Sequence, residues 1–131
     1  MAKAIVSPLL ERGEYHPQNV LGIVGSSSSI APALNDLPKE VKVVSSEDPL
    51  SKEVWKAPLK ILAVKPQQFK KITESFSSLQ LKDHVPKPLL ISVLAGITLK
   101  SLKKAFPGHT CVRAVPNTPC LVGEGLTGLA W

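Results

Sequence analysis

Residues 114–119 read Ala-Val-Pro-Asn-Thr-Pro and run on to Val-Gly-Glu-Gly at 122–125. An apolar strand that ends in two prolines flanking an Asn-Thr pair is typical of a loop that faces a ligand. The reason is that backbone groups at the carboxyl end of a parallel strand are free to bind one. Upstream, residues 62–66 repeat the design as Leu-Ala-Val-Lys-Pro. Two such strand ends predict one shared crevice at the edge of a sheet.

Strands and helices alternate along the rest of the chain. Short apolar segments predict strands at 19–24, 41–44, 60–64, 89–94 and 110–115, with the last of these ending the sheet. Helical spacing and caps predict helices at 2–10, 49–55, from Pro66 through Leu79, and from a Thr98 cap to Phe106. This alternation predicts right-handed crossovers and an α/β fold with a doubly wound, mainly parallel sheet.

Length and composition predict one soluble globular domain. The chain has 131 residues, and 44% of them are hydrophobic, which is enough to bury a core. The longest uncharged apolar runs, such as 88–98, are far shorter than the roughly 20 residues of a membrane-spanning helix. Cys111 and Cys120 are the only cysteines and have no paired spacing, so we expect no disulfide framework or metal site and a reducing cytoplasmic setting.

The formal charge of +6 suits an anionic partner, either nucleic acid or the phosphates of a dinucleotide. Nucleic-acid binders usually present aromatic rings beside their basic residues. Here the few rings are dispersed, and lysines such as Lys70 and Lys103 are expected to be solvated faces of helices. Composition therefore favours a small-molecule partner over nucleic acid or membrane.

The two strand ends at 62–66 and 114–119, with Ser-Val-Leu-Ala-Gly at 92–96 between them, resemble pyrroline-5-carboxylate reductase. The resemblance implies that residues 1–131 form a Rossmann-like NADP-binding domain. It also implies an oxidoreductase of proline biosynthesis, which uses NADPH to reduce 1-pyrroline-5-carboxylate to L-proline. In that family the first strand and its Gly-x-Gly turn precede the equivalent of residues 1–5, and a helical carboxyl-terminal domain forms the dimer.

Relative to that family, we expect a sheet that is incomplete at its amino terminus, through a misplaced start or a truncation. We likewise expect a homo-oligomer only if the helical domain is present. Without its central strand, the second and fourth strands of the family sheet would keep unpaired backbone groups. Unsatisfied buried groups cost about 1–3 kcal/mol each against a net stability of about 5–15 kcal/mol. The isolated chain is therefore expected to be marginally stable and inactive.

The glycines at 123, 125 and 128 spell Gly-x-Gly-x-x-Gly, the pattern of a dinucleotide fingerprint. That motif must lead into a helix and carry an acidic residue about 20 positions later. Only three residues follow Gly128, so we reject the match. The glycines either let the loop pass close to a ligand or a helix, or belong to a flexible end.

The resemblance implies cofactor contacts at three strand ends. After strand 19–24, an NAD enzyme would place a carboxylate on the ribose 2′-hydroxyl, whereas no Asp or Glu occurs between Tyr15 and Asn35, which favours NADPH. Four serines, residues 26–29, follow this strand. The alternative is that they only form a turn. The expected cofactor-binding residues are Ser26, Ser27, Ser29, Ala63, Val64, Lys65, Pro66, Val93, Leu94, Ala95 and Gly96.

Asn117 and Thr118 are the expected substrate-binding residues, because an amide and a hydroxyl suit a nicotinamide amide or a substrate carboxylate. The alternative is that they tie the turn to itself. No catalytic residue is assigned. His16, His84 and His109 have no carboxylate or nucleophile at a meaningful spacing. Hydride transfer to a carbon–nitrogen double bond needs mainly orientation and a proton source, because the cofactor carries the hydride.

Two other functions remain open. A non-catalytic module could use the basic surface and open sheet edges to bind another protein. A related dehydrogenase acting on a hydroxy acid would need a lysine or histidine acid–base group, which the sequence does not place.

Overall fold

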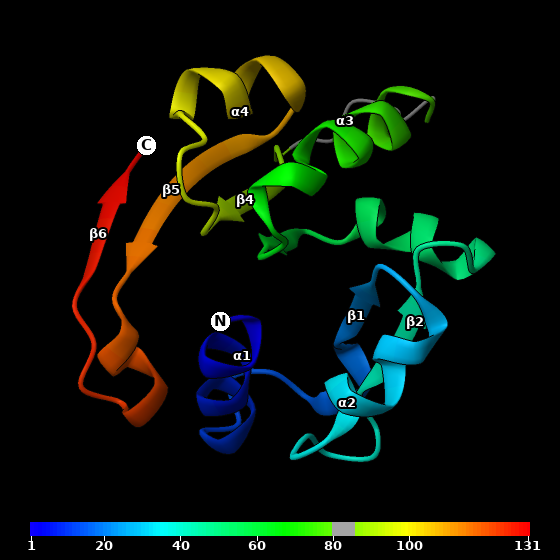
Figure 1. The fold of residues 1–131 in the computed structure, drawn as a ribbon, viewed down its shortest axis with the longest axis vertical. Coiled ribbons are helices and arrows are strands. Elements are labelled where there is room, and N and C mark those ends of the chain that lie inside the picture. Colours follow the sequence, from blue (N-terminus) through cyan, green and yellow to red (C-terminus); the bar gives the residue numbers. More distant parts are fainter. Residues whose placement is uncertain (80–85) are drawn as a thin grey trace. The chain divides into compact units, whose positions relative to one another are not determined.

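The structure is a computed structural model that describes residues 1–79 and 86–131 (Figure 1). It is a mixed α/β fold with mainly parallel strands, as the sequence predicts. The chain divides into two compact units. We call Lys3–Lys56 the amino-terminal unit, and Ala57–Trp131 with Met1–Ala2 the carboxyl-terminal unit.

The amino-terminal unit is built on a two-stranded parallel sheet. Its register runs from Leu21 opposite Lys42 to Val24 opposite Ser45. Its helices and strands are α1 (Ala2–Glu11, of which residues from Lys3 belong here), β1 (Leu21–Val24), α2 (Ile30–Leu34) and β2 (Lys42–Ser45). Its 3₁₀ turns are η1 (Pro17–Asn19), η2 (Ser27–Ser29) and η3 (Pro49–Lys56).

The carboxyl-terminal unit is built on a four-stranded sheet in the order β3-β4-β5-β6. Strands β3 to β5 are parallel and β6 is antiparallel to β5. The elements are β3 (Leu59–Leu62), α3 (Phe69–Ser77), β4 (Leu89–Ser92), α4 (Leu99–Ala105), β5 (Thr110–Pro116) and β6 (Thr127–Ala130), with 3₁₀ turns η4 (Pro66–Gln68) and η5 (Thr118–Val122).

The core of this unit lies where α3 and α4 meet the sheet. Figure 1 shows both helices on the same side of the strands, as right-handed crossovers in one direction require. Phe106, which follows α4, is fully buried, and its ring centroid lies 5.1 Å from Phe76 and 6.2 Å from Phe69. These contacts show that Phe69 and Phe76 lie on the face of α3 that is directed into the core. Burying one such side chain stabilises the fold by about 1.5–3 kcal/mol.

The prediction that the sheet ends with 110–115 is wrong, because the chain turns back and adds β6. Two hydrogen bonds start the pairing: the Asn117 amide donates to the Leu126 carbonyl (3.3 Å), and the Leu126 amide donates to Asn117 Oδ1 (3.0 Å). These contacts span nine residues and a glycine-rich loop, so no local pattern predicts them. Gly128 lies inside β6 rather than before a helix, which confirms that the fingerprint match is false.

The strands next to the predicted gap keep open edges. Among the described residues, β1 pairs only with β2, and β3 pairs only with β4, so the two sheets share no strand pairing. This agrees with the expectation of an interrupted sheet. The expected marginal stability stays a prediction.

Candidate functional site

Three predicted site segments lie at the carboxyl ends of neighbouring strands in the sheet of the carboxyl-terminal unit. We call this end of the sheet the carboxyl edge, and it is the edge meant below. Leu62 at the end of β3 lies opposite Ser92 at the end of β4, and Ser92 lies opposite Arg113 of β5. Because these strands are parallel, the segments 63–66 and 93–96 both start at this edge, and β5 continues three residues further to Pro116. The structure therefore brings together the three segments that the sequence singled out in this half of the chain.

At the end of β3, the chain passes from strand to helix through Lys65 and Pro66. Ala63 and Val64 are half-buried, whereas Lys65 and Pro66 are exposed. The Lys65 carbonyl accepts the Gln68 amide at 2.9 Å, which starts η4 and then α3. The Lys65 ammonium has no hydrogen bond or ion pair with the part of the chain that the structure describes. It is thus a free cation at the strand end.

At the end of β4, hydrogen bonds of Ser92 and Val93 fix the turn, whereas the space around Gly96 is free. Ser92 is fully buried, its Oγ accepts the Leu94 amide at 3.4 Å, and the Val93 amide donates to the Leu62 carbonyl at 3.0 Å. Leu94 is buried, while Ala95 is exposed. Gly96 is also exposed and has φ +74, with no atom within 4 Å of the position that a Cβ would take. A left-handed glycine with free space around it allows a ligand to approach the backbone closely.

The Asn117 loop is held by its own side chain. Because Asn117 Oδ1 accepts the Leu126 amide at 3.0 Å, the alternative that Asn117 ties the turn to itself holds for this oxygen. The same bond orients the carboxamide, so its NH₂ group is left to donate elsewhere. Thr118 is exposed and begins η5. Sequence reasoning missed Leu126 as the partner, because the signal lies in the pairing of β5 with β6.

The serines belong to the amino-terminal unit, where they follow β1 and form η2. Ser26 Oγ lies 3.0 Å from Ser28 Oγ and 3.1 Å from Ser29 Oγ, and the Ser29 amide donates to the Ser26 carbonyl at 3.0 Å. All four serines are exposed. The geometry is that of a local turn with hydroxyl groups at the surface, and a contact with a cofactor stays a prediction.

The titratable groups with perturbed pKa values lie away from the strand ends. Burial lowers the pKa of Lys60, whose Nζ donates to the Ala57 carbonyl at 2.5 Å near the start of β3. Burial raises the pKa of the Cys111 thiol, and the nearby charge of Lys103 opposes this. Neither Lys60 nor Cys111 belongs to the segments 63–66, 93–96 or 114–119.

Two of the three histidines lie in the described residues. His16 is exposed, and the His109 ring packs edge-on against Phe76 at 5.4 Å. His84 lies outside the described residues. Within 1–79 and 86–131, no group of His, Cys, Asp and Glu could hold a metal ion, and no helix is long and apolar enough to cross a membrane.

Parallel strands whose carboxyl ends converge in Gly, Pro and polar loops define an open α/β domain with a candidate ligand site, because ligands of such sheets bind outside those ends. No family model matches the chain. The chain is 37% identical to pyrroline-5-carboxylate reductase of Synechocystis over 99% of its own length and 45% of that protein. It thus spans about 45% of the length of this curated relative.

Solved structures give the same result. A pyrroline-5-carboxylate reductase from Coxiella burnetii matches 98% of this chain and 44% of its own, with a TM-score of 0.76 and 30% sequence identity. The Plasmodium falciparum pyrroline carboxylate reductase with NADP bound has the same fold at a TM-score of 0.68 and 21% identity, over 98% of this chain and 43% of its own. The resemblance inferred from the sequence is therefore confirmed: the chain is a Rossmann-like relative of the pyrroline-5-carboxylate reductases.

Proposed function

We propose that residues 1–131 form the NADP-binding domain of a cytoplasmic pyrroline-5-carboxylate reductase. As a whole enzyme it uses NADPH to reduce 1-pyrroline-5-carboxylate to L-proline. The observation that supports this most is the convergence of three strand ends at one edge, in a chain related along nearly all of its length to such reductases. Since the chain spans about 45% of these relatives, we expect it to bind cofactor without turning over substrate alone.

The residues at this edge fit a dinucleotide. The backbone of Ala63–Pro66 and Val93–Gly96 would line the cofactor, since Gly96 leaves room for it and the Ser92 hydroxyl fixes the turn. The unpaired Lys65 ammonium would lie near the phosphates. NADPH supplies the hydride when bound. The chain's own contribution is to hold the reacting partners in a fixed orientation, which can supply much of the rate enhancement.

The Asn117 NH₂ group and the Thr118 hydroxyl would donate hydrogen bonds to the nicotinamide amide or the substrate carboxylate. The bond from Leu126 to Asn117 Oδ1 fixes which face of the amide is presented. We assign no proton donor to the chain, because no His, Asp or Glu occurs in residues 62–66, 92–96 or 114–119. Glu124 is exposed, and we expect it to be solvated.

Ser26, Ser27 and Ser29 would hold the 2′-phosphate that distinguishes NADPH from NADH. Their exposed hydroxyls suit a phosphate, and no carboxylate lies nearby in sequence to repel it. We expect a Ser27→Asp variant to weaken NADPH binding by about tenfold and NADH binding far less, because the new carboxylate opposes the phosphate. Ser78→Asp, on an exposed serine in the other unit, is the matched control.

The proposal is tested by isothermal titration of the full chain with NADPH. We expect saturable binding that Lys65→Ala and Asn117→Ala each weaken, while Lys87→Ala, at an exposed lysine away from the strand ends, leaves it unchanged. Absence of NADPH binding by a folded chain would contradict the proposal. Steady turnover of 1-pyrroline-5-carboxylate would contradict the expectation that this chain is inactive alone.

The second candidate is a protein-interaction module without catalysis. Six large apolar side chains between residues 115 and 131 are more than half exposed, namely Val115, Leu121, Val122, Leu126, Leu129 and Trp131. An exposed apolar group of this size often marks an interface. A stable complex with another polypeptide, together with no NADPH affinity, would favour this candidate over the reductase domain.

A further inference from the structure

Arg113 of β5 differs from the other basic residues because its charge has no partner in the fold. Three Lys and Arg residues in 1–79 and 86–131 are not exposed, namely Lys3, Lys60 and Arg113. The ammonium groups of Lys3 and Lys60 donate to backbone carbonyls. Arg113 has no hydrogen bond or ion pair with any described residue, although its Nε is completely buried. Buried polar groups are normally bonded, so this guanidinium needs a partner that the fold does not supply.

The sheet register places Arg113 at the carboxyl edge. It lies opposite Ser92, the last residue of β4, and Ser92 lies opposite Leu62, the last residue of β3. Residues opposite each other in a sheet share a face. Arg113 therefore points to the same side as two buried side chains, which accounts for the burial of its Nε. The predicted cofactor-binding segments 63–66 and 93–96 start one residue beyond this row.

On the side of β6, Arg113 is uncovered. The residue opposite it is Ala130, which is exposed and has only a methyl side chain. Of the three guanidinium nitrogens, Nε alone is buried without a partner, so the two terminal NH₂ groups are accessible. A ligand can thus reach these groups from solvent.

The charges around Arg113 select an anion. Residues 57–79 and 86–131 contain two carboxylate side chains, Glu74 and Glu124, and both are exposed. Neither pairs with Arg113, and Glu74 lies 3.9 Å from a lysine of its own helix. The three strand-end segments contain no Asp or Glu, whereas Lys65 adds a second cation. A guanidinium presents paired N–H groups that match two oxygens of a phosphate or a carboxylate.

We propose that Arg113 binds an oxyanion of the ligand at the carboxyl edge, either a phosphate of the dinucleotide or the carboxylate of the substrate. The two terminal NH₂ groups donate hydrogen bonds to two oxygens that share a negative charge. The anion site follows from the surroundings of Arg113 alone, whereas the natural source of the anion rests on the proposed reductase function.

The test is an NMR titration of the full chain labelled with ¹⁵N-arginine. The sequence has two arginines, Arg113 and the exposed Arg12, so the side-chain Nε–H spectrum holds one signal for the site and one for an internal control. At constant ionic strength, we expect potassium phosphate, sodium acetate or both to shift the Arg113 signal saturably and to leave the Arg12 signal in place. No saturable shift with either anion, or equal shifts of both signals, would overturn the proposal.

NADPH and L-proline distinguish the two sources of the anion. A shift of the Arg113 signal by NADPH that phosphate reverses by competition assigns the cofactor phosphate. A shift by acetate and L-proline, with none from NADPH, assigns the carboxylate. If the chain binds NADPH but the Arg113 signal responds to no anion, this inference fails and the reductase proposal stands. If phosphate shifts the signal but NADPH does not bind, the anion site stands and the reductase proposal fails.

Variants of Arg113 separate binding from folding. Arg113→Met should weaken binding of the anion by at least about tenfold, because charge-assisted hydrogen bonds are lost. The backbone amide of Ala114 reports this binding. Arg113→Lys keeps the charge without the paired N–H groups and should recover only part of the affinity.

Thermal unfolding without added anion completes the test. Because the guanidinium has no partner among the described residues, Arg113→Met should not lower the unfolding midpoint. Arg12→Met is the matched control and should change neither the midpoint nor the anion affinity. A lower midpoint of Arg113→Met together with unchanged anion affinity would overturn the proposal, because Arg113 would then serve the fold alone.

Discussion

The two units start from the same design, a parallel strand followed by a helical crossover, but they bury their residues to different depths. In residues 1–79 and 86–131, four side chains have less than 2% exposure, and all four lie in the carboxyl-terminal unit: Leu90, Ser92, Leu102 and Phe106. The amino-terminal unit buries Val41, Val44, Ser45 and Trp55 less completely. A two-stranded sheet is marginal by itself, whereas three or more strands under helices form a stable core. The comparison teaches that local pattern places the elements, whereas the depth of burial depends on how many strands and helices pack together.

Phe106→Ala should give the largest effect. Removing a fully buried ring that meets Phe69 and Phe76 should lower the free energy of unfolding by about 3–5 kcal/mol. Hydrogen exchange should show the lost protection in residues 57–131. Val44→Ala, in the amino-terminal unit, should lower the free energy of unfolding by about 1–2 kcal/mol. Its loss of hydrogen-exchange protection should fall in residues 3–56. If each variant reduces protection equally in both units, the two unfold together and the comparison fails.

Gly125→Ala tests whether the late strand β6 belongs to the stable part of the carboxyl-terminal unit. A Cβ at Gly125 would lie 2.5 Å from Cys120 Cβ and 2.6 Å from Cys120 Cα. Because one of these atoms is backbone, the loop must shift, at a cost of about 1–3 kcal/mol.

Gly128→Ala is the matched control for that variant. No atom lies within 4 Å of its Cβ position, so the free energy of unfolding should change little. Thermal unfolding measures both variants. If Gly125→Ala is as stable as Gly128→Ala, then the loop and β6 open without affecting the core of the unit.

The sequence predicts the elements that depend on local chemistry. Apolar runs bounded by Pro and Gly place five of the six strands found in the described part of the chain to within a few residues. The predicted cap at Thr98 is confirmed, since its Oγ1 accepts the Ser101 amide at 3.1 Å. Strand β6 could not be predicted, because its apolar residues are few and its pairing with β5 is set by Asn117 and Leu126. The β-propensity of a short segment does not identify the strand with which it pairs.

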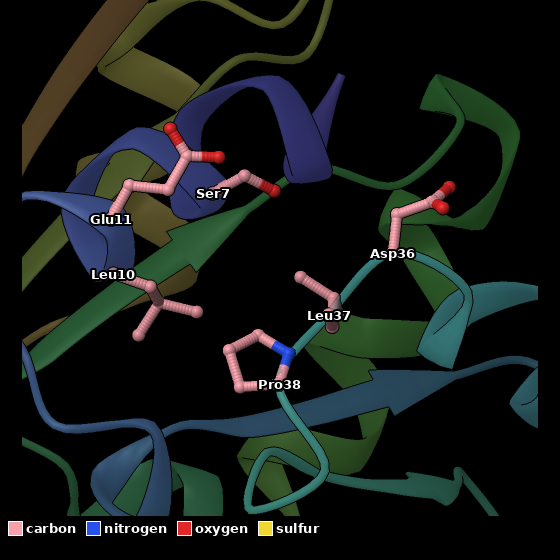
Figure 2. Close-up of a pocket in the computed structure, with 6 residues that line it drawn as sticks. All are labelled: Ser7, Leu10, Glu11, Asp36, Leu37 and Pro38. Atoms are coloured by element: carbon pink, nitrogen blue, oxygen red, sulfur yellow. The ribbon is translucent and has the colours of Figure 1, made fainter.

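The candidate site also has features that the local sequence predicts and features that depend on contacts between elements. Lys65-Pro66 and Gly96 were predictable because Pro and Gly mark strand ends, and the parallel register then brings them to one edge. The buried role of Ser92 and the orientation of the Asn117 amide depend on contacts between elements. Likewise, Glu11 and Asp36 lie far apart in sequence but line one cavity of the amino-terminal unit, so only the folded chain brings them together (Figure 2).

Lys60→Met should stabilise the carboxyl-terminal unit by about 1 kcal/mol near neutral pH, because Lys60 is only 5% exposed and a buried ammonium is poorly solvated. Burial lowers the folded pKa of Lys60 below its ordinary value near 10.5. Between these two values the unfolded chain binds more protons, so the stability of the parent chain rises with pH. The advantage of Lys60→Met should therefore shrink toward pH 10.5.

Denaturant unfolding at several pH values measures this difference. The opposite contribution of Cys111, whose pKa burial raises, is present in both proteins and cancels. Lys42→Met is the matched control, because Lys42 is an exposed strand residue in the amino-terminal unit. It should show no pH-dependent difference from the parent chain. An advantage of Lys60→Met that is constant from pH 7 to 10.5 would show that packing, and not charge burial, is responsible.

The smallest expected change in the free energy of unfolding comes from the helix caps, which differ between the two units. Thr98→Ala removes the bond from the Ser101 amide and should cost about 1 kcal/mol. Ser29 stands at the equivalent position of α2 but makes no side-chain cap bond, so Ser29→Ala should cost less than about 0.5 kcal/mol. Thr98→Ser, which keeps the hydroxyl, should restore most of the loss. Equal costs for Thr98→Ala and Ser29→Ala would mean that Ser29 caps α2 in solution. In that case the serines would be committed to their own turn and less free to hold a phosphate.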